Sequence, residues 1–143
     1  MPRQIRNLTR RLAWFRYRLR RFLRFSEKAA HDSGITPLQH QLLLGVAGFT
    51  GRGWATVSEL SEFLQERHNA VVGLVQRAEK AGLVRKSRGR SDQRFVRVRV
   101  SMRGARILRR LTQLHRREVE RFEGGFLAVA GVRRKDFELK ENV

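Results

Sequence analysis

The chain has 143 residues, 41% of them hydrophobic, which is enough for one domain with a modest core. It contains no cysteine, which excludes a disulfide scaffold, a thiolate metal site and a thiol redox switch. Thirty-two Lys and Arg residues oppose 13 Asp and Glu residues, so the formal net charge is +19, and a folded domain with this charge is expected to bind a polyanion such as nucleic acid.

A first helix is expected from about residue 5 to residue 32, ending at the turn Asp32-Ser33-Gly34. Nine arginines and no acidic residue lie between positions 3 and 24. Apolar residues recur here at spacings of three and four, as in a seam between helices: Ile5, Leu8, Leu12, Phe15, Leu19 and Phe22. This seam predicts dimerisation, with Leu8, Leu12, Phe15 and Leu19 in the interface. Two alternatives remain. The N-terminal segment could be a targeting peptide, or the protein could bind a membrane surface or a partner helix through residues 5–25.

Two helix starts follow, and each has the residues of a capping box. Thr36-Pro37-Leu38-Gln39 opens a second helix, which is expected to end at residues 50–53. Its inward stripe is predicted from the helical period: Leu38, Leu42, Val46 and Phe49. Thr56-Val57-Ser58-Glu59 opens a short third helix that turns Val57, Leu60 and Leu64 inward.

A fourth helix is expected from His68 to Ala81 after a tight turn at residues 65–67, with Gly82 as its left-handed C-cap. Its inward face is predicted from the helical spacing: Val71, Leu74, Val75 and Ala78. The opposite face offers groups for base edges and phosphates: His68, Asn69, Val72, Gly73, Gln76, Arg77 and Lys80. A solvent-exposed polar face without a ligand is the alternative reading. Two helices joined by a tight turn match a helix-turn-helix, whose second helix enters the major groove.

The period then changes to two, which predicts a two-stranded hairpin from residues 83–87 and 95–101 around a turn at 88–93. Val96, Val98 and Val100 share one face. Seven residues of 85–99 are basic and one, Asp92, is acidic. Charge at a sheet edge also prevents aggregation, but this density favours contact with DNA beside the recognition helix. The residues selected for that contact are Lys86, Arg88, Arg90, Asp92 and Arg94.

A long fifth helix is expected after Ser101, which caps it. Its apolar side is defined by the helical period: Ile107, Leu111, Leu114, Val119, Phe122 and Phe126. Leu114 and Phe122 complete the predicted dimerisation residues. Gly124-Gly125 is expected to interrupt this helix, and the tail from Arg133 to Val143 to fray. The predicted fold is therefore mainly α with a small β-hairpin wing (α+β).

The predicted organisation is a single domain, 1–143. It consists of a winged helix-turn-helix at 35–103 between dimerisation helices at 1–33 and 104–143. No apolar run reaches the 18 residues of a membrane span, and a cytoplasmic location is expected.

The chain resembles the MarR-type transcriptional regulators from about Leu19 to Arg117. The resemblance rests on an ordered set of segments: Ile35 to Gln39, Val57 to Leu60, Val71 to Val84, Asp92-Gln93-Arg94 and Ser101 to Gly104. It implies a homodimer that binds a pseudo-palindromic operator, and in many such proteins a phenolic or anionic ligand releases the DNA.

The resemblance also implies roles for particular residues. Arg94 would enter the minor groove while Asp92 braces the wing tip, and Asn69, Ala70, Gly73 and Gln76 would lie at base edges. Ser58 and Arg67 complete the predicted DNA-binding set. Gly73 stands where many members carry a polar or basic residue, which shifts the expected specificity to His68, Asn69 and Gln76.

Enzymatic and metal functions lack support in the sequence. The four histidines do not form a metal-spaced cluster, and no phosphate loop, nucleophile elbow or acidic pair is present. No cofactor is expected. The sequence thus predicts a ligand- or signal-responsive repressor that binds double-stranded DNA. The rivals are a basic architectural or RNA-binding protein without sequence readout, and the membrane-surface or helix-partner protein named above.

Overall fold

The structure is a computed structural model that describes residues 1–89 and 95–130, with side chains up to Gly125. Contacts divide the chain into two compact units. One is residues 29–113, here called the central unit, and the other is residues 1–28 together with Leu114 onward, here called the terminal unit. Arg90, Asp92, Arg94, the side chain of Phe126 and the predicted frayed tail lie outside the described part.

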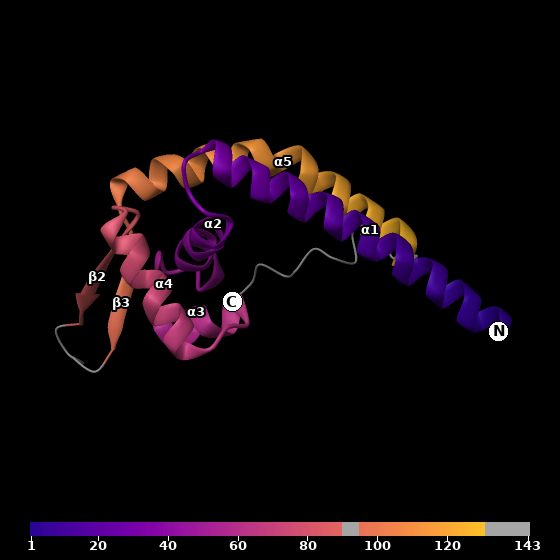
Figure 1. The fold of residues 1–143 in the computed structure, drawn as a ribbon, viewed down its shortest axis with the longest axis horizontal. Helices are drawn as coiled ribbons and strands as arrows, with labels where there is room; N and C mark the ends of the chain where they lie inside the picture. Colours follow the sequence, from indigo (N-terminus) through magenta and orange to yellow (C-terminus); the bar gives the residue numbers. More distant parts are fainter. Residues whose placement is uncertain (90–94, 131–143) are drawn as a thin grey trace. The chain divides into compact units, whose positions relative to one another are not determined.

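The central unit is mainly helical with one small antiparallel sheet (Figure 1). Its elements follow one another along the chain: α2 (Pro37–Leu44), the π-helix η1 (Gly45–Phe49), β1 (Trp54–Thr56), α3 (Val57–Leu64), α4 (His68–Lys80), β2 (Val84–Arg88) and β3 (Val96–Val100). It also contains the end of α1 (Arg3–Asp32) and the start of α5 (Met102–Ala130). The predicted helix, tight turn, helix and hairpin are confirmed.

Local capping explains where these elements begin and end. Thr36 and Gln39 form the first predicted capping box, with N–O distances of 3.0 and 3.1 Å, and Thr56 and Glu59 form the second, with 3.2 and 3.3 Å. Gly82 has φ +73°, and the amide of Leu83 donates to the carbonyl of Ala78 at 2.9 Å. These predictions were correct because caps and left-handed glycines depend on few neighbouring residues.

The predicted inward stripe of the second helix is partly wrong. Leu42 and Val46 are buried, but Leu38 and Phe49 are 38% and 51% exposed. The helix changes to the π-helix η1 at Gly45, and this wider turn shifts every later side chain around the axis. Leu43 is buried in addition, and the ring of Phe49 lies 5.1 Å from that of Phe63.

Among the described residues the sheet has three strands, in the order β1-β3-β2, so it contains the predicted hairpin and one further strand. The additional strand β1 is three residues long, and it pairs with β3 so that Trp54 lies opposite Arg99 and Thr56 opposite Arg97. The predicted hairpin is β2-β3, with Val84 opposite Val100 and Arg88 opposite Val96. β1 therefore joins the wing directly to the start of α3.

The core of the central unit is apolar and comes from every helix and strand of that unit. Its fully buried large side chains are Leu42, Leu43, Val46, Leu60, Val71, Val75, Leu83, Val84, Val98 and Leu111. Val57 and Leu64 pack against it at half-buried positions, as the sequence predicted for α3. Burial of a Val or Leu side chain contributes roughly 1.5–3 kcal/mol, so this cluster fixes which face of each helix remains outside.

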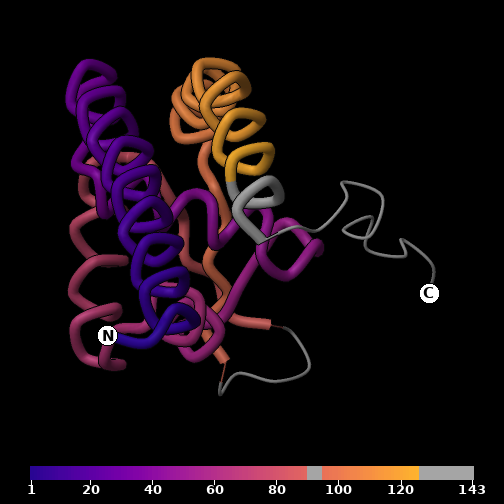
Figure 2. Tube along the Cα trace, turned by 90° about the vertical axis from the view of Figure 1, so that its right-hand side faces the viewer, coloured from indigo at the N-terminus to yellow at the C-terminus, as the bar shows by residue number. Residues whose placement is uncertain are grey.

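The terminal unit consists of α1 and the second half of α5, which lie side by side (Figure 2). Phe122 packs against Phe15 and Phe22 with ring centroids 6.3 and 5.5 Å apart, and His115 lies 5.2 Å from Phe25. Because the contacts run in opposite directions along the two helices, α1 and α5 are antiparallel. No helix of the described residues is long and apolar enough to cross a membrane.

The expected interruption at Gly124-Gly125 does not occur, since α5 continues to Ala130. A glycine costs a helix only about 1 kcal/mol relative to alanine, which packing can offset. A Cβ at Gly125 would collide with the Arg18 guanidinium. Gly125 thus lets the Arg18 side chain lie directly on α5.

Candidate nucleic-acid interface

The recognition-helix candidate α4 has a buried face and an outward face, as the sequence predicted. Its predicted inward residues, Val71, Leu74, Val75 and Ala78, are at most 4% exposed. Since these four side chains anchor the helix, the residues on its other side point away from the core. The orientation of α4 is therefore set by hydrophobic burial and does not depend on a ligand.

The predicted base-reading residues lie on this outward face. Exposed side chains come from His68, Asn69, Ala70, Gln76, Arg77 and Lys80, whereas Val72 and Gly73 are half-buried. A Cβ at Gly73 would lie 3.1 Å from Arg77 Nη1, so the Arg77 guanidinium folds back over the glycine. Asn69 and Gln76 remain the exposed amides that can pair with adenine.

The first turn of α4 also suits an anion. Arg67 precedes the helix and is exposed, and among the described residues no side chain caps this turn. The leading amides of α4 are therefore open to a phosphate oxygen. Ser58 is exposed in the first turn of α3.

The first wing strand is tied to the end of α4 through Glu79. Its carboxylate accepts from the Lys86 backbone amide at 3.2 Å and lies 3.5 Å from Lys86 Nζ. Lys86 was predicted to bind DNA, but here its charge is paired, so its phosphate contact would compete with Glu79. Arg88 ends β2 and is exposed.

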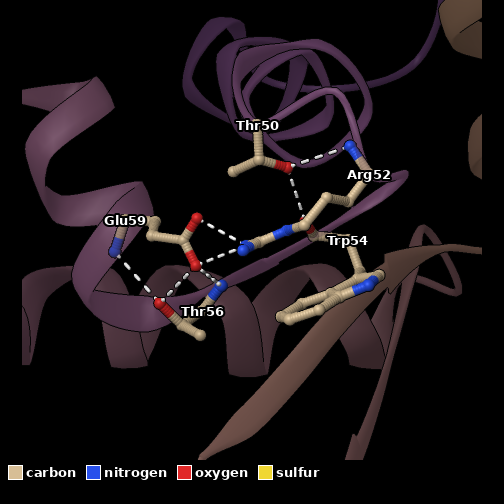
Figure 3. Close-up of polar contacts among 5 residues, drawn as sticks. All are labelled: Thr50, Arg52, Trp54, Thr56 and Glu59. Carbon is tan, nitrogen blue, oxygen red and sulfur yellow. Dashed lines mark hydrogen bonds and ion pairs between the residues drawn. The ribbon is translucent and has the colours of Figure 1, made fainter. Parts of the chain in front are cut away.

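A polar cluster around Trp54 holds the wing to the start of α3 (Figure 3). The Arg52 guanidinium points toward the Glu59 carboxylate, with both oxygens 2.5 Å from Nη2, and lies 3.8 Å from the centre of the Trp54 ring. The Arg97 guanidinium, from β3, lies 4.5 Å from the same ring. Trp54 therefore connects the 50–53 loop, β1 and the middle wing strand.

The charge state of Glu59 depends on this cluster. The hydrogen bond from Arg52 lowers the pKa of the Glu59 carboxyl below its ordinary value of 4.5, and bonds from Thr56 act in the same direction against desolvation. Because the pKa of Glu59 is lower in the folded chain than in the unfolded chain, ionised Glu59 stabilises the fold above pH 4.5. This contribution is lost as the pH falls through the lowered pKa.

The sequence reasoning missed Arg52, Trp54 and the role of Arg97. The sign of a strand in the sequence was the short run Trp54-Ala55-Thr56, which follows a glycine and ends at the first residue of a capping box. Three residues are too few to establish a strand period, and the stacking partners lie far apart in the sequence.

The predicted dimerisation residues divide into two groups within the terminal unit. Leu8 and Leu12 are both 58% exposed, and Leu114 is 49% exposed. Phe15, Leu19 and Phe122 are half-buried, and Phe15 and Phe122 contact each other across α1 and α5. A single chain therefore covers only part of the predicted seam.

Within residues 1–89 and 95–130, no group of His, Asp and Glu side chains is placed to hold a metal ion. His31 and His68 are exposed, whereas His40 and His115 are buried.

Known proteins share this architecture. Residues 33–94 match the model of the MarR family. A MarR family protein from Bacillus stearothermophilus aligns with a TM-score of 0.68 and 25% identity, over 83% of this chain and 79% of that one. No curated protein sequence matches the chain.

Two further solved structures are similar in fold. A mutant MarR from E. coli complexed with operator DNA aligns with a TM-score of 0.61 and 18% identity, over 84% of this chain and 80% of that one. BpsR from Bordetella bronchiseptica, whose DNA binding is regulated by 6-hydroxynicotinic acid, aligns with a TM-score of 0.63 and 16% identity, over 87% and 91%.

Proposed function

We propose that this chain, whose residues 33–94 match the model of the MarR family, is a transcriptional regulator that binds double-stranded DNA. It acts as a homodimer on a pseudo-palindromic operator and represses transcription until a small molecule or another signal releases it. The predicted DNA-binding residues on α3, α4 and the wing form its contact surface.

The observation that carries the proposal is the outward face of α4. Four buried apolar residues hold this helix so that Asn69 and Gln76 stay exposed together. The basic strand β2 follows directly and is linked to α4 by Glu79 and Lys86. Side-chain amides read base edges, and arginines beside them hold the backbone.

Dimerisation is supported by the terminal unit. Leu8, Leu12 and Leu114 leave apolar surface exposed on α1 and α5, and a second copy would cover it. Twofold symmetry would set the two α4 helices roughly 34 Å apart, which is one turn of DNA.

The proposed response of this protein to a small molecule rests on one similar protein. The similar protein BpsR responds to 6-hydroxynicotinic acid, and we extend the property, without the ligand, to this chain. Selection of bound sites from a random DNA pool, followed by footprinting, tests the proposed binding to a pseudo-palindromic operator. A footprint confined to one palindrome supports it, whereas binding without sequence preference favours the architectural rival.

Base reading by α4 predicts a difference between two DNAs. Asn69→Ala or Gln76→Ala should weaken binding to the selected site by about 1–3 kcal/mol, because each removes one bidentate amide–base pair. Binding to random DNA should change much less. Titrations of both DNAs by fluorescence anisotropy measure this. Equal losses on both would mean that α4 contacts only the backbone.

The wing arginines should give two distinct results. Arg88→Ala should weaken all sequences alike and lower the slope of log K against log salt by about 1, which is the mark of one lost phosphate contact. Arg94→Ala should in addition relax the preference for A·T-rich flanks, since arginine favours a narrow minor groove. Asp92→Ala should resemble a milder Arg94→Ala. If Arg94→Ala leaves affinity, flank preference and salt slope unchanged, the wing is only a charged edge.

A further inference from the structure

We propose that α1 carries a second nucleic-acid surface, separate from the winged helix-turn-helix, which binds a single strand. The surface is a stripe along one side of the helix, here called the basic stripe. Its members recur at spacings of three or four residues and are all exposed: Arg3, Arg6, Arg10, Trp14, Tyr17, Arg21 and Arg24.

The geometry of the helix separates this stripe from the packing seam. At about 100° per residue, the basic stripe lies roughly opposite the line of Leu12, Phe15 and Leu19. Within the seam Phe15 packs against Phe122 of α5, whereas Leu12 stays exposed. All members of the stripe are nevertheless exposed, along roughly 32 Å of helix. Its middle members Trp14, Tyr17 and Arg21 border α5, because they line a pocket together with Glu118, Arg121 and Phe122.

The charge of the stripe fits phosphate groups. No acidic residue precedes Glu27 in the sequence, so carboxylates of α1 do not neutralise its first six turns. Glu118 of α5 lines the pocket beside Arg21, but its carboxylate is paired with Arg121 at 3.2 Å. Guanidinium groups bind phosphate oxygens bidentately. Five arginines in one row can follow the backbone of one strand.

Two exposed aromatic rings in the middle of the row favour a single strand over a duplex. Trp14 and Tyr17 are 48% and 46% exposed, and their rings meet edge to face at 5.6 Å. The Arg21 guanidinium lies 5.9 Å from the centre of the Tyr17 ring. Unstacked bases of a single strand can stack on such rings, whereas the bases of a duplex are already stacked.

A membrane surface fits this arrangement less well. A helix that lies on a membrane buries its apolar face between flanking basic residues. Here the apolar seam is on the far side of the helix from the basic stripe, so inserting the seam would turn most of the arginines away from the headgroups.

The test uses the full chain and a labelled 20-nucleotide oligothymidylate, followed by anisotropy. Arg10→Ala with Arg21→Ala should weaken binding about tenfold and lower the salt slope by about 1.4, since each lost contact to a single strand contributes about 0.7. The matched control is Arg11→Ala with Arg16→Ala, because these arginines are also exposed on α1 but lie off the stripe. It should change the affinity no more than about twofold.

Base stacking has its own readout. Trp14→Phe should abolish most of the quenching of tryptophan emission by the oligonucleotide, and Trp14→Ala with Tyr17→Ala should cost about tenfold in affinity. Three outcomes would each overturn the proposal. They are equal losses of affinity in the two double-arginine variants, no binding of the oligonucleotide by the parent chain, and binding only to vesicles of anionic lipid. Operator binding is measured in parallel, so a failure of the proposed function is distinguished from a failure of the stripe.

Discussion

Replacing Leu12 and Phe15 by aspartate should convert the protein from a dimer to a monomer. Leu12 is 58% exposed within one chain, and an apolar seam left open in this way is expected to be covered by the partner. Two carboxylates in a buried interface would be desolvated without a partner charge, which costs several kcal/mol. Sedimentation at micromolar concentration should show twice 16.8 kDa for the parent and 16.8 kDa for the variant.

The loss of the dimer should also weaken operator binding about 100-fold or more, since the second half-site is then no longer bound intramolecularly. Ala13→Asp is the matched control for the single variant Leu12→Asp, because each adds one carboxylate to α1 and Ala13 is exposed beside the seam. Leu12→Asp alone, followed by circular dichroism, separates dissociation from unfolding. A double variant that sediments as the parent does would refute dimerisation through this seam.

Replacing Gly104 by alanine should destabilise the central unit by about 2–3 kcal/mol, in the range of core overpacking. A Cβ at this position would collide with the carbonyl oxygen of Leu83 and lie 3.0 Å from Val100 Cγ1. The same carbonyl accepts from the Ser101 amide at 2.9 Å, and Ser101 Oγ donates to the Gly82 carbonyl at 2.5 Å. The substitution would thus push apart the junction of α4, β2 and α5.

Urea unfolding at one fixed protein concentration measures this effect, because the proposed dimerisation would make stability depend on concentration. Gly124→Ala is the control in the same helix, since its added Cβ would meet no atom of the described residues within 4 Å apart from its own helix turn. It should stabilise the protein by up to about 1 kcal/mol through helix propensity. If both alanines stabilise, the contact at Gly104 is not close enough to matter.

Short stretches of sequence were enough to predict the helix starts, the Gly82 cap and the buried face of α4. Thr36 with Gln39 and Thr56 with Glu59 needed only a spacing of three residues. The inward face of α4 followed from a period of 3.6 residues. These features are local, so a short window of sequence contains the physics that decides them.

The tertiary structure alone decided the π-helix at Gly45, the strand β1 and the continuation of α5 past Gly125. The stacking of the Arg52 and Arg97 guanidinium groups on the Trp54 ring likewise depends on tertiary contacts. β1 is too short to be stable except by pairing with β3, and the Gly125 helix turn is covered by Arg18. Each of these features depends on a partner distant in the sequence, and the free energy of that contact offsets a weak or unfavourable local preference.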